Sequence, residues 1–172
     1  MAVVIVINGS GGVGKSTFIE LCKKFNNNVV ELSTVDSVKR IATIAGWNGV
    51  KDEKGRKFLN DIKTAMDDYD HLSWKNVDKE IDINSDKIYF VNAREPEDID
   101  YFVDKYWAFT LLIQNPRVKQ ITTNHADARV NDYRYDYYIT NNGTLKDFEA
   151  RAKDFIEDAS CDGLAKYNCW DE

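Results

Sequence analysis

The chain has 172 residues, of which 43% are hydrophobic and 30% are charged. This composition is typical of one compact globular domain and excludes a mainly disordered, collagen-like or disulfide-dense protein. The formal net charge is −6, with 23 Lys and Arg against 29 Asp and Glu. Because nucleic-acid affinity comes largely from cations that neutralise phosphates, we expect no nucleic-acid polymer as a partner, whereas a small phosphate ligand in a local pocket is compatible with this charge.

The sequence contains three cysteines, Cys22, Cys161 and Cys169. Their number is odd and none follows C-x-x-C spacing, which argues against a disulfide framework and against a zinc site. A reducing cytoplasm is therefore the expected location. The apolar run at residues 2–7 is much shorter than the roughly 20 residues that span a bilayer, so no membrane association is expected.

Short apolar runs alternate with segments of helical periodicity along the chain. Residues 3–7 are continuously β-branched, which predicts a strand buried on both faces of a sheet. Further strands are predicted at residues 29–32, 88–91, 108–113 and 137–139, and helices at residues 15–25, 35–45, 53–66, 96–105 and 144–158. Trp74, Val77 and Ile81 could mark another short helix within residues 67–86. This alternation predicts an α/β fold with a five-stranded parallel sheet and helices on both faces.

The first predicted strand leads into Gly9-Ser10-Gly11-Gly12-Val13-Gly14-Lys15-Ser16-Thr17. This run matches G-x-x-x-x-G-K-[ST] in the strand–loop–helix setting that the P-loop motif requires. In such a loop backbone N–H groups surround phosphate oxygens, Lys15 binds the outer phosphates and the Ser16 hydroxyl ligates Mg²⁺. The predicted nucleotide-phosphate site consists of Gly11, Gly12, Val13, Gly14, Lys15, Ser16 and Thr17. An accidental glycine-rich turn is the alternative.

The P-loop alone does not distinguish kinases from GTPases and ATPase motors. The sequence holds no N-K-x-D run, with which GTPases usually read guanine. Motor ATPases usually carry an acidic residue at the end of an apolar strand, whereas the strand predicted at residues 88–91 is followed by Asn92. A small kinase is therefore favoured.

Three further segments are W-N-G-V-K-D-E-K-G-R at residues 47–56, N-A-R-E-P-E-D at residues 92–98 and D-Y-Y-I-T-N-N-G-T-L at residues 136–145. Together with the P-loop they resemble the phage-type deoxynucleoside monophosphate kinases over most of the chain. The last segment is also similar to dephospho-coenzyme A kinases, so it indicates the wider nucleoside-phosphate kinase group rather than one acceptor. Asn92 stands where the family has Asp, which leaves Asp36 and Glu95 as alternative carboxylates near Mg²⁺.

The resemblance implies a single P-loop kinase domain with an acceptor-binding insertion at about residues 33–82 and a lid at about residues 114–134. The residues that would bind the acceptor are Thr34, Asp36, Lys39, Arg40, Arg56 and Arg94. The cations that would act in catalysis are Lys15, Arg94, Arg117 and Arg129, with Lys119 as a further lid cation. Asn142 and Gly143 would lie beside the donor base. Each of these residues has an alternative role as a solvated charge, a helix cap or a turn residue.

These observations favour a kinase that uses ATP and Mg²⁺ to phosphorylate a nucleoside or deoxynucleoside monophosphate. Two alternatives stay open: a kinase for another small acceptor, such as dephospho-coenzyme A or a hydroxylated metabolite, and a non-catalytic nucleotide-binding switch. Separate basic clusters favour two phosphorylated ligands, and hence the kinase. Small nucleotides are the expected partners, a homodimer is compatible with the sequence, and a phage-encoded chain would act in the host cytoplasm. The aromatic residues expected in the core, rather than stacked on a base, are Trp47, Trp74, Tyr106 and Trp107.

Overall fold

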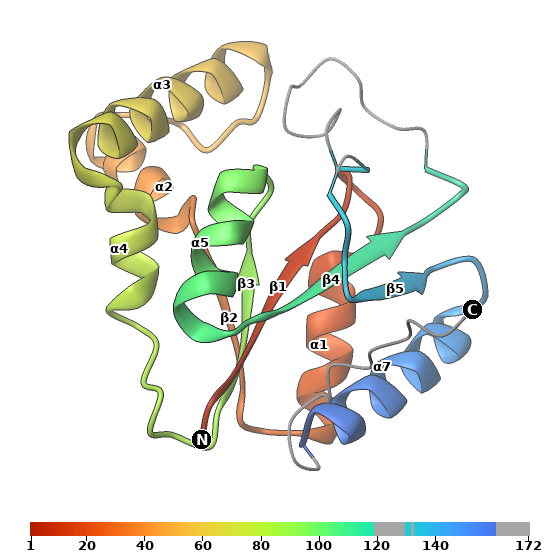
Figure 1. The fold of residues 1–172 in the computed structure, drawn as a ribbon. Helices are drawn as coiled ribbons and strands as arrows, with labels where there is room; N and C mark the ends of the chain where they lie inside the picture. Colours follow the sequence, from red (N-terminus) through yellow and green to blue (C-terminus); the bar gives the residue numbers. More distant parts are fainter. Residues whose placement is uncertain (119–129, 132, 161–172) are drawn as a thin grey trace. The chain divides into compact units, whose positions relative to one another are not determined.

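The computed structural model describes residues 1–118, 130–131 and 133–160, and in this part of the chain it shows one five-stranded sheet in the order β2-β3-β1-β4-β5 (Figure 1). The strands are β1 (Val3–Asn8), β2 (Val29–Ser33), β3 (Ile88–Asn92), β4 (Phe109–Gln114) and β5 (Tyr137–Thr140). The helices are α1 (Lys15–Phe25), α2 (Asp36–Ile44), α3 (Glu53–Asp70), α4 (Leu72–Asp78), α5 (Pro96–Tyr106) and α7 (Leu145–Ser160). β1 pairs in parallel with β3 and β4, and β4 pairs in parallel with β5. The predicted α/β fold is confirmed.

The central strand β1 is buried on both faces, as its β-branched sequence predicts. Ile5 and Ile7 belong to a buried cluster that includes Phe18 of α1 and side chains of α7. Val4 and Val6 are also buried, and because side chains alternate along a strand they point to the opposite face. Figure 1 shows α1 and α7 side by side on one face of the sheet and α5 on the other. Helices therefore cover both faces of the sheet.

The helix boundaries follow local signals in the sequence. Thr144 and Asp147 cap α7 reciprocally: the Asp147 carboxylate accepts from the Thr144 N–H at 2.7 Å, and the Thr144 hydroxyl accepts from the Asp147 N–H at 3.2 Å. The hydrogen bonds that the Thr144 N–H and hydroxyl donate to the Asp147 carboxylate lower its pKa. Pro96 lies in the first turn of α5, as predicted. The helix expected at residues 53–66 continues to Asp70, beyond its apolar spacing, and a Lys63–Asp67 ion pair of 2.8 Å supports the added turn.

The prediction that Trp107 belongs to the core is wrong, because its side chain is 78% exposed. Trp107 follows the last residue of α5 and has a φ of 55°, in the left-handed region. The chain turns at this residue, and the side chain therefore leaves the buried face of the helix. Trp47, Trp74 and Tyr106 are partly buried.

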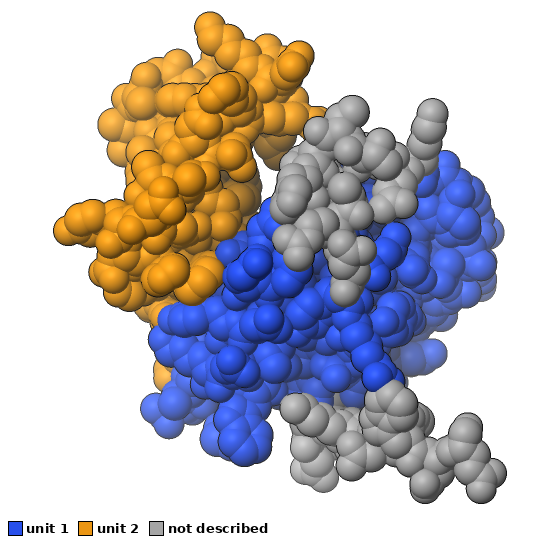
Figure 2. Space-filling model, turned by 45° about the horizontal axis from the view of Figure 1, so that its top comes forward, with its two compact units in different colours: residues 1–31, 83–172 blue, residues 32–82 orange. Residues whose placement is uncertain are grey.

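The chain divides into two compact units, coloured separately in Figure 2. The sheet unit comprises Met1–Glu31 and Ile83–Glu172, and the helical unit comprises Leu32–Asp82. Within the helical unit α2, α3 and α4 pack on one another, with Val38, Ala42, Met66 and Val77 buried. Its limits nearly coincide with the insertion expected at about residues 33–82, whose part in acceptor binding stays a prediction. Over the described residues, none of the helices has the length and apolarity needed to cross a membrane.

Candidate functional site

The P-loop connects the end of β1 to the start of α1 and depends on glycine at two positions. Gly9 has a φ of 144°, and a Cβ at this residue would collide with the carbonyl oxygen of Ile113. Gly14, the N-cap of α1, has a φ of 108°, and a Cβ there would lie 2.8 Å from Nδ2 of Asn141. L side chains rarely adopt these conformations. Glycine at these two positions therefore allows the loop backbone to pass close to β4 and to the β5–α7 connection.

The side chains of the P-loop divide between the core and the surface. Val13 is 4% exposed and packs in the hydrophobic cluster, which anchors the loop. Ser16 and Thr17 are exposed in the first turn of α1. The Lys15 ammonium donates to the Ser10 carbonyl at 3.1 Å and to the carbonyl of Gly9. The first N–H groups of a helix have no intrahelical partner, so this end of α1 offers hydrogen-bond donors and partial positive charge to phosphates.

The donor set at the P-loop fits a magnesium ion that arrives with nucleotide phosphates. Mg²⁺ prefers oxygen ligands and usually combines few protein ligands with phosphates and water. The exposed Ser16 hydroxyl supplies one such oxygen. Among the residues that the structure describes, no group of three or more His, Cys, Asp or Glu side chains could hold a metal ion.

All five described strands end in polar residues, and in the sheet unit these are Asn8 of β1, Asn92 of β3, Gln114 of β4 and Thr140 of β5. The parallel register pairs Ile7 with Asn92 and Gln114 with Thr140, so these residues lie along one edge of the sheet. Ligands of open α/β sheets bind at this carboxyl edge. The P-loop lies at the same edge, because it follows Asn8 directly.

The carboxylate beside Asn92 comes from a residue that the sequence reasoning missed. Asn92 Nδ2 donates to Oε1 of Glu31 at 2.9 Å. Glu31 lies in β2, next to β3 in the sheet, and its only signal in the sequence is a charge inside an apolar strand. Asp36, one of the carboxylates considered from the sequence, forms a 2.9 Å ion pair with Lys39 instead.

The structure brings the backbone of Arg94 to the base of the P-loop. The linking residue is Asn8, whose Nδ2 donates to the Arg94 carbonyl at 3.2 Å and whose Oδ1 accepts from the Gly9 N–H at 2.7 Å. Asn8 is fully buried and was also missed from the sequence, although a polar residue at the end of a buried strand is a usable signal. Arg94 follows β3 at the carboxyl edge, and its role toward an acceptor stays a prediction.

The structure also brings together Arg117 and the predicted donor-base residues. Arg117 Nη2 donates to the Gly143 carbonyl at 3.1 Å and to the carbonyl of Asn142. The neighbouring Asn141, not singled out from the sequence, donates through Nδ2 to the Val13 carbonyl at 3.0 Å. The β5–α7 connection is thus fastened both to the P-loop and to Arg117. Arg129 and Lys119, the other predicted lid cations, lie outside the described residues.

Five of the six predicted acceptor residues lie in the helical unit: Thr34, Asp36, Lys39, Arg40 and Arg56. Thr34 is 3% exposed, which suits a structural position as well as a ligand contact. Arg56 Nε donates to the Lys51 carbonyl at 2.9 Å and therefore helps to hold the turn before α3. Lys39 is engaged by Asp36, as described above.

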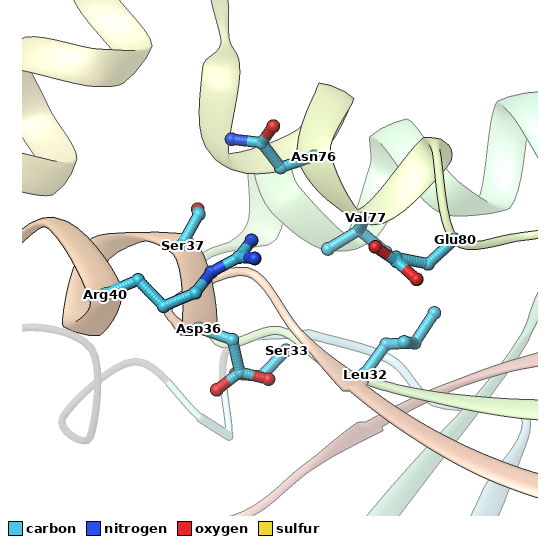
Figure 3. Close-up of a pocket in the computed structure, with 8 residues that line it drawn as sticks. All are labelled: Leu32, Ser33, Asp36, Ser37, Arg40, Asn76, Val77 and Glu80. Carbon is cyan, nitrogen blue, oxygen red and sulfur yellow. The ribbon is translucent and has the colours of Figure 1, made fainter.

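Arg40 lines a pocket of about 290 Å³ within the helical unit (Figure 3). The lining residues are Leu32, Ser33, Asp36, Ser37, Arg40, Asn76, Val77 and Glu80. Figure 3 shows the Arg40 guanidinium and the Glu80 carboxylate pointing into this space from opposite sides. The pocket therefore offers both hydrogen-bond donors and acceptors. Asn76 and Glu80, which belong to α4 and to the segment after it, were missed because the sequence in this region predicted only a short helix.

The sequence matches no protein-family model and no curated protein at a significant level. Two solved structures have similar folds. Shikimate kinase from Aquifex aeolicus has a TM-score of 0.54 and 12% identity, over 93% of this chain and 99% of that chain. A putative kinase from Chloroflexus aurantiacus has a TM-score of 0.51 and 11% identity, over 91% of this chain and 96% of that chain. The chain therefore has the α/β fold of the P-loop kinases.

Proposed function

We propose that the protein is an ATP-dependent kinase that transfers the γ-phosphate of ATP to the phosphate of a nucleoside or deoxynucleoside monophosphate. The observation that carries this proposal is the P-loop, with Lys15 and Ser16 at the carboxyl edge of a kinase-like sheet and the Arg94 loop hydrogen-bonded to its base. The nucleotide acceptor is supported by the resemblance of residues 47–56, 92–98 and 136–145 to nucleoside-phosphate kinases.

The chemistry requires positioning and positive charge rather than a covalent intermediate. The acceptor phosphate is already largely ionised at neutral pH, so no general base is needed, and catalysis depends on in-line placement and screening of the transferring group. Lys15 exchanges its bonds to the Gly9 and Ser10 carbonyls for bonds to phosphate oxygens. The planar guanidinium of Arg94 can hold two phosphate oxygens at once. Bound Mg²⁺, with Ser16 among its ligands, would supply further charge neutralisation.

The pocket of the helical unit supports a small polar acceptor. Its volume of about 290 Å³ is at the low end of ligand pockets, which span roughly 300–1,000 Å³. Arg40 can donate to carbonyl or ring-nitrogen acceptors, and Glu80 and Asn76 can accept from N–H or O–H groups. We assign to these three side chains the neutral part of the acceptor, the base or the sugar, because the carboxylate of Glu80 would repel a phosphate.

A second candidate is a kinase for a hydroxylated acceptor. The carboxylates of Asp36 and Glu80 in the same pocket favour it, since an alcohol, unlike a phosphate, must lose a proton to a base as it attacks. Either carboxylate could accept that proton. The two candidates share the P-loop and differ only in the acceptor.

The test is ADP production from ATP and Mg²⁺ with each ribo- and deoxynucleoside monophosphate, and in parallel with a set of hydroxylated metabolites. We expect ADP formation that depends on at least one monophosphate and that is lost in Lys15→Ala. Activity with hydroxylated acceptors only would select the second candidate. Equal ADP formation with and without every acceptor would refute both kinase proposals.

A further inference from the structure

Asn8 is a fully buried polar side chain at the end of a strand whose other residues are apolar. Its amide uses every hydrogen-bonding group that it has. Oδ1 accepts from the Gly9 N–H at 2.7 Å, and Nδ2 donates to the Arg94 carbonyl at 3.2 Å and to the Tyr135 hydroxyl at 2.9 Å. An apolar side chain would cost less free energy at such a buried position, which indicates that the amide is there for its hydrogen bonds.

The partners of Asn8 belong to three segments that are far apart in the sequence. Gly9 opens the P-loop, and its carbonyl accepts from the ammonium of Lys15. Arg94 follows β3, and Tyr135 precedes β5. One amide therefore connects the backbone beside Lys15 to the backbone of Arg94, the two cations that we assign to phosphates. Its third partner is the hydroxyl of Tyr135.

All three partners agree on the orientation of the Asn8 amide: the Gly9 N–H can only donate, the Arg94 carbonyl can only accept, and Tyr135 adds a third constraint. The Tyr135 hydroxyl has one proton, which it donates to the Val130 carbonyl at 3.0 Å, so toward Asn8 it can only accept. The amide must then present its NH₂ group to Tyr135 and Arg94 and its oxygen to Gly9. Burial raises the pKa of Tyr135 to about 12, which keeps this hydroxyl protonated at neutral pH.

We propose that Asn8 is a positioning residue that holds the Arg94 loop in fixed register with the P-loop, and that the Tyr135 hydroxyl supports the orientation of its amide that the Gly9 and Arg94 backbone groups require. This inference rests on the proposed function, because the register matters if Arg94 and Lys15 act on phosphates that react with each other. Displacements of about 1 Å at such groups are large enough to slow transfer substantially.

Asn8→Asp tests the amide with almost no change of shape. The carboxylate still accepts from the Gly9 N–H, but it cannot donate to the Arg94 carbonyl, which then faces an oxygen. We expect kcat/KM for the acceptor to fall about tenfold or more, while the Kd for ATP without acceptor changes less than about twofold. Tyr135→Phe is expected to act in the same direction with a smaller effect. Tyr133→Phe is the matched control, because the Tyr133 hydroxyl donates to Asp100 and not to Asn8.

A double-mutant cycle with Arg94→Lys separates positioning from a general structural role. If Asn8 acts through Arg94, Asn8→Asp lowers kcat/KM in the wild-type background and has almost no further effect in Arg94→Lys. Multiplied effects of the two substitutions would overturn the proposal. Should Asn8→Asp not fold, as judged by thermal unfolding, the same cycle is run with Tyr135→Phe.

If the wild-type protein transfers phosphate to no acceptor, the proposed function is refuted. The hydrogen-bond network of Asn8 is then tested separately by nuclear magnetic resonance. The side-chain NH₂ protons of Asn8 are expected to exchange slowly with water and to shift in Tyr135→Phe but not in Tyr133→Phe. Fast exchange, or equal shifts in both variants, would contradict the network itself.

Discussion

The P-loop edge of the sheet unit and the pocket of the helical unit hold their polar groups in different ways. At the P-loop edge Asn8 is fully buried and Asn141 is partly buried, and both are bonded to backbone groups. In the pocket the charged groups are exposed side chains, Asp36 and Arg40 of helix α2 and Glu80 of the segment after α4. In the proposed kinase, phosphate binding would therefore depend mainly on the backbone, whereas acceptor choice would depend on side chains that can change without disturbing the fold. Substitutions at the two places are therefore expected to differ in size and in kind.

Lys15→Ala is expected to have the largest effect. Removing one pre-organised charge from a site that excludes water typically lowers kcat by about 10²–10³. We expect the fold to persist, because the Gly9 and Ser10 carbonyls to which the Lys15 ammonium donates belong to the same loop. The measurement is steady-state ADP formation, with thermal unfolding as the control. Wild-type turnover in the folded variant would remove the P-loop from the reaction.

Arg94→Lys is expected to have the next largest effect. Lysine keeps the charge but loses the planar fork that can hold two phosphate oxygens. We expect kcat/KM for the monophosphate to fall by at least about tenfold, or ~1.4 kcal/mol of transition-state stabilisation, with little change in ATP affinity. A loss confined to ATP binding would instead place Arg94 beside the ATP phosphates. Arg94 would then not contact the acceptor.

Arg40→Ala and Glu80→Gln probe the pocket of the helical unit. Because both side chains are exposed, each is expected to raise KM for the acceptor only about three- to tenfold and to change the order of preferred acceptors, with kcat and ATP affinity nearly unchanged. Lys57→Ala is the matched control, since Lys57 is an exposed cation of α3 that pairs with Asp61 outside the pocket. If Lys57→Ala has the same effect as Arg40→Ala, the pocket does not select the acceptor.

The last prediction concerns the free energy of unfolding rather than activity, and it separates the buried core from both sites. Burial raises the pKa of the Cys22 thiol to about 12, so the folded state keeps the neutral thiol while the unfolded chain ionises at lower pH. The free energy of unfolding therefore contains a contribution that is complete below the unfolded pKa and is lost as pH rises toward 12, at up to about 1.4 kcal/mol per pH unit. Urea unfolding at pH 8 and pH 10 measures this slope, which Cys22→Ala reduces. An equal slope in the variant would show that other groups cause it.

The parts of the fold that depend on local sequence could be predicted. The β-branched run of β1, the P-loop glycines and the Thr144 cap each specify their structure over a few residues, and all three are confirmed. The hydrogen-bond partners of Asn8, Asn141 and Glu31 could not be predicted, because they are set by the strand order β2-β3-β1-β4-β5. Strand order depends on packing between segments that are distant in the sequence.

The measurement that tests the central claim most directly follows the transferred phosphate itself. The protein is incubated with Mg²⁺, ATP labelled in its γ-phosphate and a mixture of ribo- and deoxynucleoside monophosphates, and the products are separated. We expect the label to leave ATP in the presence of an acceptor and to be found in a nucleoside diphosphate, and we expect Lys15→Ala to abolish this transfer. Label found only in inorganic phosphate, at a rate that no acceptor changes, would contradict it.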